Sequence, residues 1–154
     1  MTNMLPDHVG WRLWSASRAW QAEFAAAMRA SGHVWFSEGR AALLGHVARN
    51  GTRQSTLIER AGISKQAVQQ LLDGLEEEGI VERIADASDR RGKFVRYTQK
   101  GLAALRDGDR IKQEIEKRYR LHIGERRFAA LMDALRALEA NDGQHSERQA
   151  DSSQ

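Results

Sequence analysis

The chain has 154 residues, about the length of one domain with extensions, and 41% of them are hydrophobic against 29% that are charged. This composition supports a folded core, and the sequence contains neither a run of about 18 apolar residues nor a secretory signal, so we expect a cytoplasmic protein with no membrane partner. The absence of cysteine excludes disulfide scaffolds, thiolate zinc sites and Fe–S clusters. A net charge of +3 is compatible with a nucleic-acid partner, and a single proline favours long helices.

The N-terminal quarter predicts a long helix that begins with Asp7 as its N-cap and ends at Ser31-Gly32. Apolar residues at helical spacing form a first strip, and two tryptophans add a second; in chain order they are Trp11, Leu13, Trp14, Trp20, Phe24 and Met28. A helix with two apolar faces usually packs both on its own domain and on a partner chain. We therefore interpret residues 7–36 as an N-terminal dimerisation helix.

The next segment predicts a helix-turn-helix. One helix follows Ser37 and ends at Asn50-Gly51, a short helix covers residues 55–61, and a further helix runs from its cap Ser64 to about Glu78. This last helix has a buried stripe and a polar outer face: Val68, Leu71, Leu72 and Leu75 against Lys65, Gln66, Gln69, Gln70 and Asp73. Two helices joined by a tight turn, the second with an amide-rich outer face, are typical of DNA-binding helix-turn-helix units.

Residues 80–85 and 93–97 then predict a β-hairpin with a polar turn at residues 86–92. Between residues 83 and 100 the sequence has six basic residues and two acidic ones, a surplus of four positive charges that exceeds the net charge of the whole chain. The basic residues are Arg83, Arg90, Arg91, Lys93, Arg96 and Lys100, and the acidic ones are Asp86 and Asp89. The basic character of the protein is therefore concentrated on the hairpin.

Two helices complete the chain. Thr98 is the expected N-cap of the first, and Gly124 separates it from the second, whose apolar residues repeat in a narrow seam: Phe128, Leu131, Leu135 and Leu138. We predict that residues 102–140 form C-terminal dimerisation helices with this seam and Leu13 in the interface. The polar residues 141–154 predict a disordered tail.

The polar helix face suits readout of DNA. The amides of Gln66, Gln69 and Gln70 match the hydrogen-bonding edge of adenine in the major groove, while Ser64 and Lys65 lie at the helix start, where phosphate binds well. The alternative is a merely solvated face, which the basic hairpin disfavours.

On the hairpin, we assign Arg91 to the minor groove, Arg90 and Lys93 to the DNA backbone, and Asp89 to restraining the arginine. The alternative there is a solvated turn.

Residues 56–101 resemble the multiple antibiotic resistance regulator (MarR) family of winged-helix transcription factors. The residues that carry the resemblance are Leu57, Gly62-Ile63-Ser64, Val68, Leu72-Asp73-Gly74-Leu75-Glu76, Gly79-Ile80-Val81-Glu82-Arg83, Asp89-Arg90-Arg91-Gly92-Lys93 and Thr98-Gln99-Lys100-Gly101. With its flanking helices the resemblance covers residues 7–140. It implies a homodimer on a pseudo-palindromic operator and a small-molecule pocket between the dimerisation and DNA-binding regions. The chain has Ala67-Val68-Gln69-Gln70 where the family commonly has Thr-Val-Thr-Arg, so Gln70 lacks the usual arginine contact to phosphate.

The resemblance places an effector pocket near the aromatic residues of the first quarter. We expect a flat aromatic or apolar effector, with five candidate ligand-binding residues: Trp11, Trp14, Trp20, His33 and Trp35. The alternative for each tryptophan is a place in the dimer core. Arg18 or His46 is a candidate partner for a ligand carboxylate, although each also fits a packing or surface role.

No motif in the sequence predicts an enzyme, a cofactor or a metal site. There is no nucleophile elbow, glycine-rich phosphate loop or pair of catalytic carboxylates. The pairs Glu38 with His46 and His122 with Glu125 are weak metal candidates, because an acid beside a histidine is common on surfaces.

The sequence therefore predicts a mainly α protein with a small β-hairpin wing, in which residues 37–101 form a winged helix-turn-helix domain. The function we expect is a homodimeric, sequence-specific regulator of double-stranded DNA, a repressor that a small effector releases from its operator. The alternative is a winged-helix adaptor that acts through protein contacts without a specific operator. The basic residues at the hairpin tip argue against the adaptor, which has no need of them.

Overall fold

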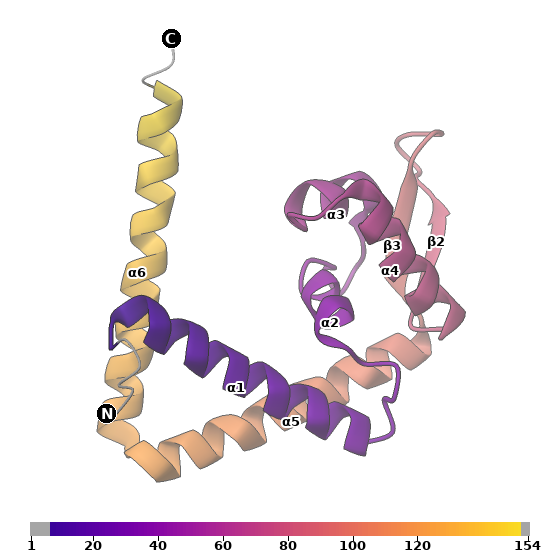
Figure 1. Ribbon diagram of the computed structural model, residues 1–154. Coiled ribbons are helices and arrows are strands. Elements are labelled where there is room, and N and C mark those ends of the chain that lie inside the picture. Colours follow the sequence, from indigo (N-terminus) through magenta and orange to yellow (C-terminus); the bar gives the residue numbers. More distant parts are fainter. Residues whose placement is uncertain (1–6, 152–154) are drawn as a thin grey trace, which may run out of the picture. The chain divides into compact units, whose positions relative to one another are not determined.

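The computed structural model describes residues 7–151, with side chains as far as residue 140. Six helices and a small antiparallel sheet follow each other in the order α1 Val9–Ala30, α2 Glu38–Leu44, β1 Thr52–Arg53, α3 Gln54–Arg60, α4 Lys65–Glu77, β2 Val81–Ala85, β3 Lys93–Tyr97, α5 Gln99–Ile123 and α6 Glu125–Asp151 (Figure 1). The prediction of a mainly α fold with a β-hairpin wing is confirmed. The chain forms two compact units, which divide within α5 after Lys112. None of the described helices is both long and apolar enough to cross a bilayer.

Helix α1 begins one residue later than the sequence predicts. His8 is the N-cap, because its backbone is extended and its Nδ1 accepts a hydrogen bond from the backbone N–H of Trp11 at 3.2 Å. Asp7 instead pairs with the guanidinium of Arg12 at 2.6 Å. The helix ends at Ala30 with Ser31 as its C-cap, followed by Gly32 in the left-handed region (φ +98°), as the sequence predicts.

Helix α2 ends earlier than predicted, at Leu44 rather than near Asn50. The backbone that follows bonds to other elements: the hydroxyl of Tyr97 donates to the carbonyls of Leu44 (3.1 Å) and Val47 (3.3 Å), and the N–H of Ala48 donates to the Thr52 hydroxyl (2.9 Å). These tertiary contacts replace the helical hydrogen bonds that the sequence pattern suggested.

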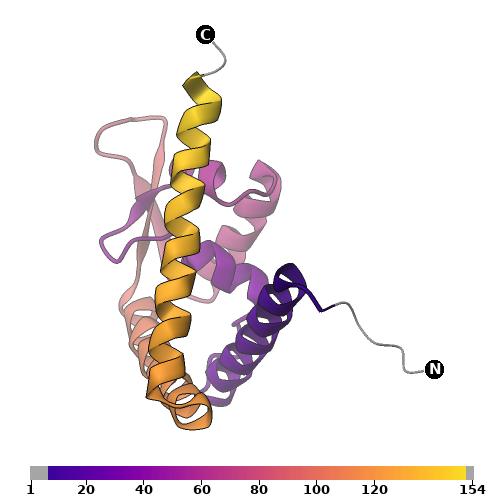
Figure 2. The ribbon, with the colours of Figure 1, turned by 90° about the vertical axis from the view of Figure 1, so that its left-hand side faces the viewer.

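Helices α3 and α4 and the sheet share one core, in which Leu57, Val68, Leu72 and Leu75 are fully buried. The strand order is β1-β3-β2, with Thr52 opposite Val95 and Val81 opposite Tyr97. Strand β1 has only two residues, too few for any periodicity, so sequence reasoning missed it. The loop between β2 and β3 projects from this helix-and-sheet module as a wing (Figures 1 and 2).

The second half of α5 and helix α6 form the second unit, and Gly124 separates them in the left-handed region (φ +88°), as predicted. Phe128 is buried, with the guanidinium of Arg120 4.2 Å from its ring centre. The sequence predicts a disordered tail from residue 141, whereas in the structure α6 continues to Asp151. This stretch has one glycine and no proline, so nothing in it interrupts helical hydrogen bonding. Residues 152–154 of the predicted tail lie outside the described residues.

Candidate nucleic-acid interface and adjoining cavity

Helix α4 presents one apolar and one polar face. Ser64 is its N-cap and accepts a hydrogen bond from the N–H of Ala67 at 3.1 Å, and Ser64, Lys65 and Gln66 at the helix start are exposed. Val68, Leu72 and Leu75 point into the core, and the predicted DNA-reading side chains lie on the other side. Of these, Lys65, Gln66 and Gln70 are exposed, whereas Gln69 is half-buried at the border between the two faces.

Arg83 connects β2 to α4. Its Nε and its backbone N–H both donate to Oε2 of Glu76 at 3.1 Å, and its Nη2 donates to Asp73. The hydrogen bond from the Arg83 side chain lowers the pKa of the Glu76 carboxyl, so the pair is ionised at neutral pH. Arg83 and Asp73 are therefore engaged within the protein, and they hold the wing and α4 as one unit.

A buried carboxylate orders the wing tip. Asp86 accepts hydrogen bonds from the N–H (2.9 Å) and hydroxyl (2.8 Å) of Ser88, and its Oδ2 lies 3.0 Å from Nε of Arg53. The bond from the Ser88 backbone is the main cause that lowers the pKa of Asp86. Arg53 also contacts the Ser88 side chain. Asp86 thereby ties the hairpin loop to β1.

Asp89 restrains the tip through the backbone rather than through an ion pair. Its Oδ1 accepts from the N–H of Arg91 at 3.0 Å, and its carbonyl accepts from the N–H of Gly92 at 3.0 Å. The restraint predicted for Arg91 is present, but it acts on the main chain and leaves the guanidinium exposed. The Asp89 carboxylate thus shapes the turn without occupying the arginine.

Only half of the six basic residues counted on the hairpin are unpaired. Arg83 is held by Asp73 and Glu76, Arg96 pairs with Glu82 across the strands, and Nζ of Lys100 donates to the carbonyl of Glu78 at 2.7 Å. Within the described residues, no ion pair or hydrogen bond holds the side chains of Arg90, Arg91 and Lys93, and all three are exposed. Among these six basic residues, the three without a partner in the described part of the chain therefore lie at or beside the wing tip.

A second feature of the same compact unit is a pair of apolar cavities. One, of about 120 Å³, lies between α1, the α1–α2 connection, α2, β3 and the start of α5; the other, of about 260 Å³, lies between α1 and α2. Both are lined by Phe24, Phe36 and Lys112. The two phenylalanine rings meet edge to face at 5.3 Å, and Nζ of Lys112 lies 5.4 Å from the centre of the Phe24 ring. An ammonium group thus stands beside both apolar spaces.

Two of the five predicted ligand-binding residues line these cavities. Trp35 lines the smaller one and is only 7% exposed, yet its Nε1–H has no partner among the described residues. Trp20 lines the larger cavity and stacks on Phe24 at 5.1 Å.

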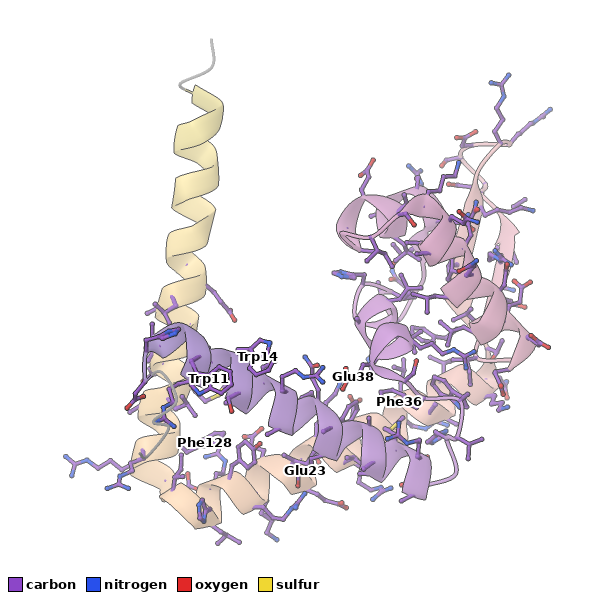
Figure 3. The ribbon with its side chains drawn as sticks, viewed as in Figure 1. Trp11, Trp14, Glu23, Phe36, Glu38 and Phe128 are labelled. Carbon is purple, nitrogen blue, oxygen red and sulfur yellow. The ribbon has the colours of Figure 1, made fainter. Side chains whose placement is uncertain are left out.

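The other three lie elsewhere. His33 is held by Asp107, with Nε2 2.8 Å from Oδ2. Trp11 and Trp14 stack on each other at 5.0 Å near the start of α1, while Phe36 lies at the opposite end of that helix (Figure 3).

Sequence reasoning missed several cavity residues. Phe24 was placed on an apolar strip of the first helix and was not among the candidate ligand-binding residues, and Tyr97 and Lys112 were not proposed for this site. Burial raises the pKa of Tyr97 to about 12, so its hydroxyl stays neutral and keeps its hydrogen bonds to the backbone after α2. Glu38, a weak metal candidate, pairs with Arg18 at 2.8 Å, so both of these earlier candidates are engaged with each other.

The fold and the wing define a winged helix-turn-helix protein with long flanking helices, and a family model described as MarR family matches residues 38–92. Among solved structures, the transcriptional regulator PA3341 is 31% identical, with 89% of this chain and 99% of that chain covered and a TM-score of 0.69. Wild-type MarR from E. coli in its apo form is 17% identical (88% and 98% covered, TM-score 0.71). The transcriptional repressor CouR bound to a 23-mer DNA duplex is 25% identical (86% and 92% covered, TM-score 0.69).

No curated protein matches the chain. The chain belongs to the MarR family of transcriptional regulators, so the resemblance found in the sequence is confirmed. The members of this family are regulators rather than enzymes, in agreement with the prediction that this chain is not an enzyme.

Proposed function

We propose that this MarR-family regulator binds double-stranded DNA in a sequence-specific manner and does so in the cytoplasm. The observation that carries the proposal is the wing tip, where Arg90, Arg91 and Lys93 are exposed and unpaired on a loop that Asp86 and Asp89 hold in shape. Cations on an ordered loop bind phosphates or a narrow minor groove at small entropic cost. The similarity to CouR, which was solved on a DNA duplex, supports the same partner.

In this proposal α4 reads the major groove. Gln66 and Gln70 are exposed and donate and accept hydrogen bonds at base edges, with Gln69 at the border of the face. Ser64 and Lys65 lie in the first turn, where backbone N–H groups and an ammonium meet phosphate. The hydrogen bonds of Arg83 to α4 fix the position of the wing relative to this helix, so that α4 can bind the major groove while the wing binds the minor groove.

We further propose a homodimer, because apolar side chains remain exposed on a single chain. Leu13 is 43% exposed, Leu131 42% and Leu138 53%, and Leu135 between them is half-buried. Phe128 is already buried within the chain, so it packs beneath this apolar seam and does not form its outer surface. A two-fold partner is the commonest way to bury such stripes, and it would place two α4 helices about one DNA turn, roughly 34 Å, apart on a pseudo-palindrome.

The effector that we propose is a flat aromatic acid that releases the operator, as expected of a repressor. Trp20, Phe24 and Trp35 supply apolar walls, the unpartnered Nε1–H of Trp35 is a hydrogen-bond donor, and Lys112 supplies the positive charge. A ligand carboxylate would satisfy the last two groups. For Trp11 and Trp14, which line neither cavity, the dimer interface is the better assignment.

The experiment is selection of duplexes from a random pool at two salt concentrations, followed by sequencing. We expect an inverted repeat and a binding constant that falls steeply with salt, since phosphate contacts release counterions. Arg91→Ala should weaken operator binding by about 1–3 kcal/mol. Arg96→Ala is the matched control, because it removes the same side chain from the same hairpin where Glu82 already pairs with it. Enrichment of no sequence would overturn the proposal and favour an adaptor that binds proteins.

A further inference from the structure

The connection between α1 and α2 links the cavity to two arginines. The rings of Trp35 and Phe36 line the smaller cavity, and their backbone carbonyls point to guanidinium groups: Nη1 of Arg40 donates to the Trp35 carbonyl at 2.8 Å, and Nη1 of Arg29 donates to the Phe36 carbonyl at 3.2 Å. The ring of Trp35 is joined to its backbone through Cα and Cβ, and close packing around the buried ring limits how far it can turn without moving the backbone. Any movement of the Trp35 ring that shifts its backbone therefore also shifts the acceptor of Arg40.

Arg40 in turn lies against the DNA-reading helix. Its guanidinium covers Gly74 in α4, where a Cβ atom would stand 2.6 Å from Nη2 and 3.3 Å from Cζ. A glycine inside a helix is about 1 kcal/mol less favourable than alanine. The guanidinium occupies the space that an alanine methyl group would take, which explains why glycine fits this position. One side chain thus touches both the cavity segment and α4.

We propose that Arg40 is a positioning residue that couples occupancy of the cavity to the placement of α4; this inference rests on the proposed function. The buried Nε1–H of Trp35 has no partner in the part of the chain that the structure describes, so an occupant with an acceptor group engages this residue first. Displacement of Trp35 moves its carbonyl, Arg40 follows its acceptor, and the contact at Gly74 changes. The planar fork of arginine makes both contacts at once, which the single ammonium of lysine does not.

The chain offers a matched control for this contact. Gly39 lies in α2, but a Cβ there would stand 3.6 Å from Cδ2 of Leu71 in α4, an ordinary van der Waals distance. Gly39→Ala and Gly74→Ala thus make the same substitution where α2 and α4 pack, and only the second displaces Arg40.

The first test uses the free protein labelled with 5-fluorotryptophan, with the ¹⁹F resonance of Trp35 assigned by Trp35→Phe. We expect Gly74→Ala to shift the Trp35 resonance by more than its line width and Gly39→Ala to leave it in place. In an Arg40→Lys background, Gly74→Ala should not shift the Trp35 resonance further, because the flexible lysine side chain can move away from the added methyl group. An unmoved Trp35 resonance in Gly74→Ala, or an undiminished shift in the Arg40→Lys background, would overturn the proposal.

If Gly74→Ala fails to fold, Arg40→Lys alone keeps the question decidable, since it too should shift the Trp35 resonance. Spectra in which all four tryptophans move would indicate general disturbance and count against a specific link.

The second test adds the selected operator duplex at saturation. The Trp35 resonance should shift in the wild-type protein, and this shift should be lost in Arg40→Lys even though the duplex is bound, because binding linkage is reciprocal. Persistence of the shift in Arg40→Lys would overturn the coupling. A wild-type protein that binds no duplex would instead refute the proposed function, while the free-protein measurement still decides whether Arg40 links the cavity to α4.

Discussion

The helix-and-sheet module that we propose reads DNA and the cavity are built in different ways within one compact unit. The module uses residues 52–97, and many of its contacts join close neighbours, such as Asp86 with Ser88 and Arg83 with Glu76, while Asp86 also pairs with Arg53 of β1. The cavity takes its walls from α1, α2, β3 and α5, as far apart in the chain as Phe24 and Lys112. A projecting polar surface is assembled by local turns and caps, whereas a concave apolar site requires elements that are distant in sequence.

The two regions also differ in electrostatics. Around the wing, carboxylates pair with Arg53, Arg83 and Arg96, and the cations without partners stand at the tip. The cavity has one ammonium group, that of Lys112, beside aromatic rings. Substitutions should therefore affect affinity for DNA through many weak phosphate contacts, and affinity for a small acid through one charged group.

The largest expected effect is on the core of α3, α4 and the sheet. Leu72→Ala removes a fully buried side chain beneath the reading face of α4, and we expect a loss of about 2–5 kcal/mol in the free energy of unfolding. Urea denaturation measures it. Gln70→Ala on the exposed face of the same helix should change stability by about 0.5 kcal/mol or less. Equal effects from the two variants would contradict the assignment of buried and reading faces.

The next effect concerns the free cations. The double variant Arg90→Ala with Lys93→Ala should reduce the slope of log K against log salt by about 2 in magnitude for each wing, since each phosphate contact contributes roughly 0.9. Fluorescence anisotropy with the selected operator over a salt series measures the slope. An unchanged slope would show that these side chains do not contact phosphate. Stability should stay the same, because neither side chain has a partner among the described residues.

The effect of Lys112 on the cavity is tested by Lys112→Met, which keeps an unbranched side chain, one atom shorter, and removes the charge. Binding of naphthalene-2-carboxylate should weaken by roughly tenfold, about 1.4 kcal/mol, whereas binding of the neutral naphthalene-2-methanol should stay the same. Isothermal titration calorimetry of both compounds on both proteins gives the comparison. Equal losses for the acid and the alcohol would indicate a packing role for Lys112.

The smallest effect is the pH dependence of the link between the wing and α4. Arg83 lowers the pKa of Glu76 below its ordinary value of 4.5, so this pair contributes stability above that value, and the contribution is lost as pH falls through the lower folded pKa. Urea midpoints from pH 6 downward should fall less steeply in Arg83→Met than in the wild type. A steeper fall in the variant would contradict the expectation that the Arg83–Glu76 pair loses its stabilising contribution as pH falls. Glu82→Gln, which removes the partner of Arg96, provides a comparison on the same hairpin.

How far the sequence predicted the structure differs between the two regions. The caps Ser37, Ser64 and Thr98 lie where their side chains predict, because capping depends on a few adjacent backbone groups. The wing tip follows from turn-forming residues for the same reason. The end of α2 did not follow, since the hydroxyl of Tyr97 and that of Thr52 decide it from elsewhere in the chain.

Local sequence by itself determined the helix-turn-helix, the β-hairpin wing and the presence of positive charge there, because helix periodicity, caps and turns act over a few residues. Only the tertiary structure decided which cations remain free, which tryptophans face a cavity, and that Lys112 stands beside them. Ion pairing between elements and enclosure of a cavity depend on distances between residues of different helices and strands. Those distances exist only once the elements have packed.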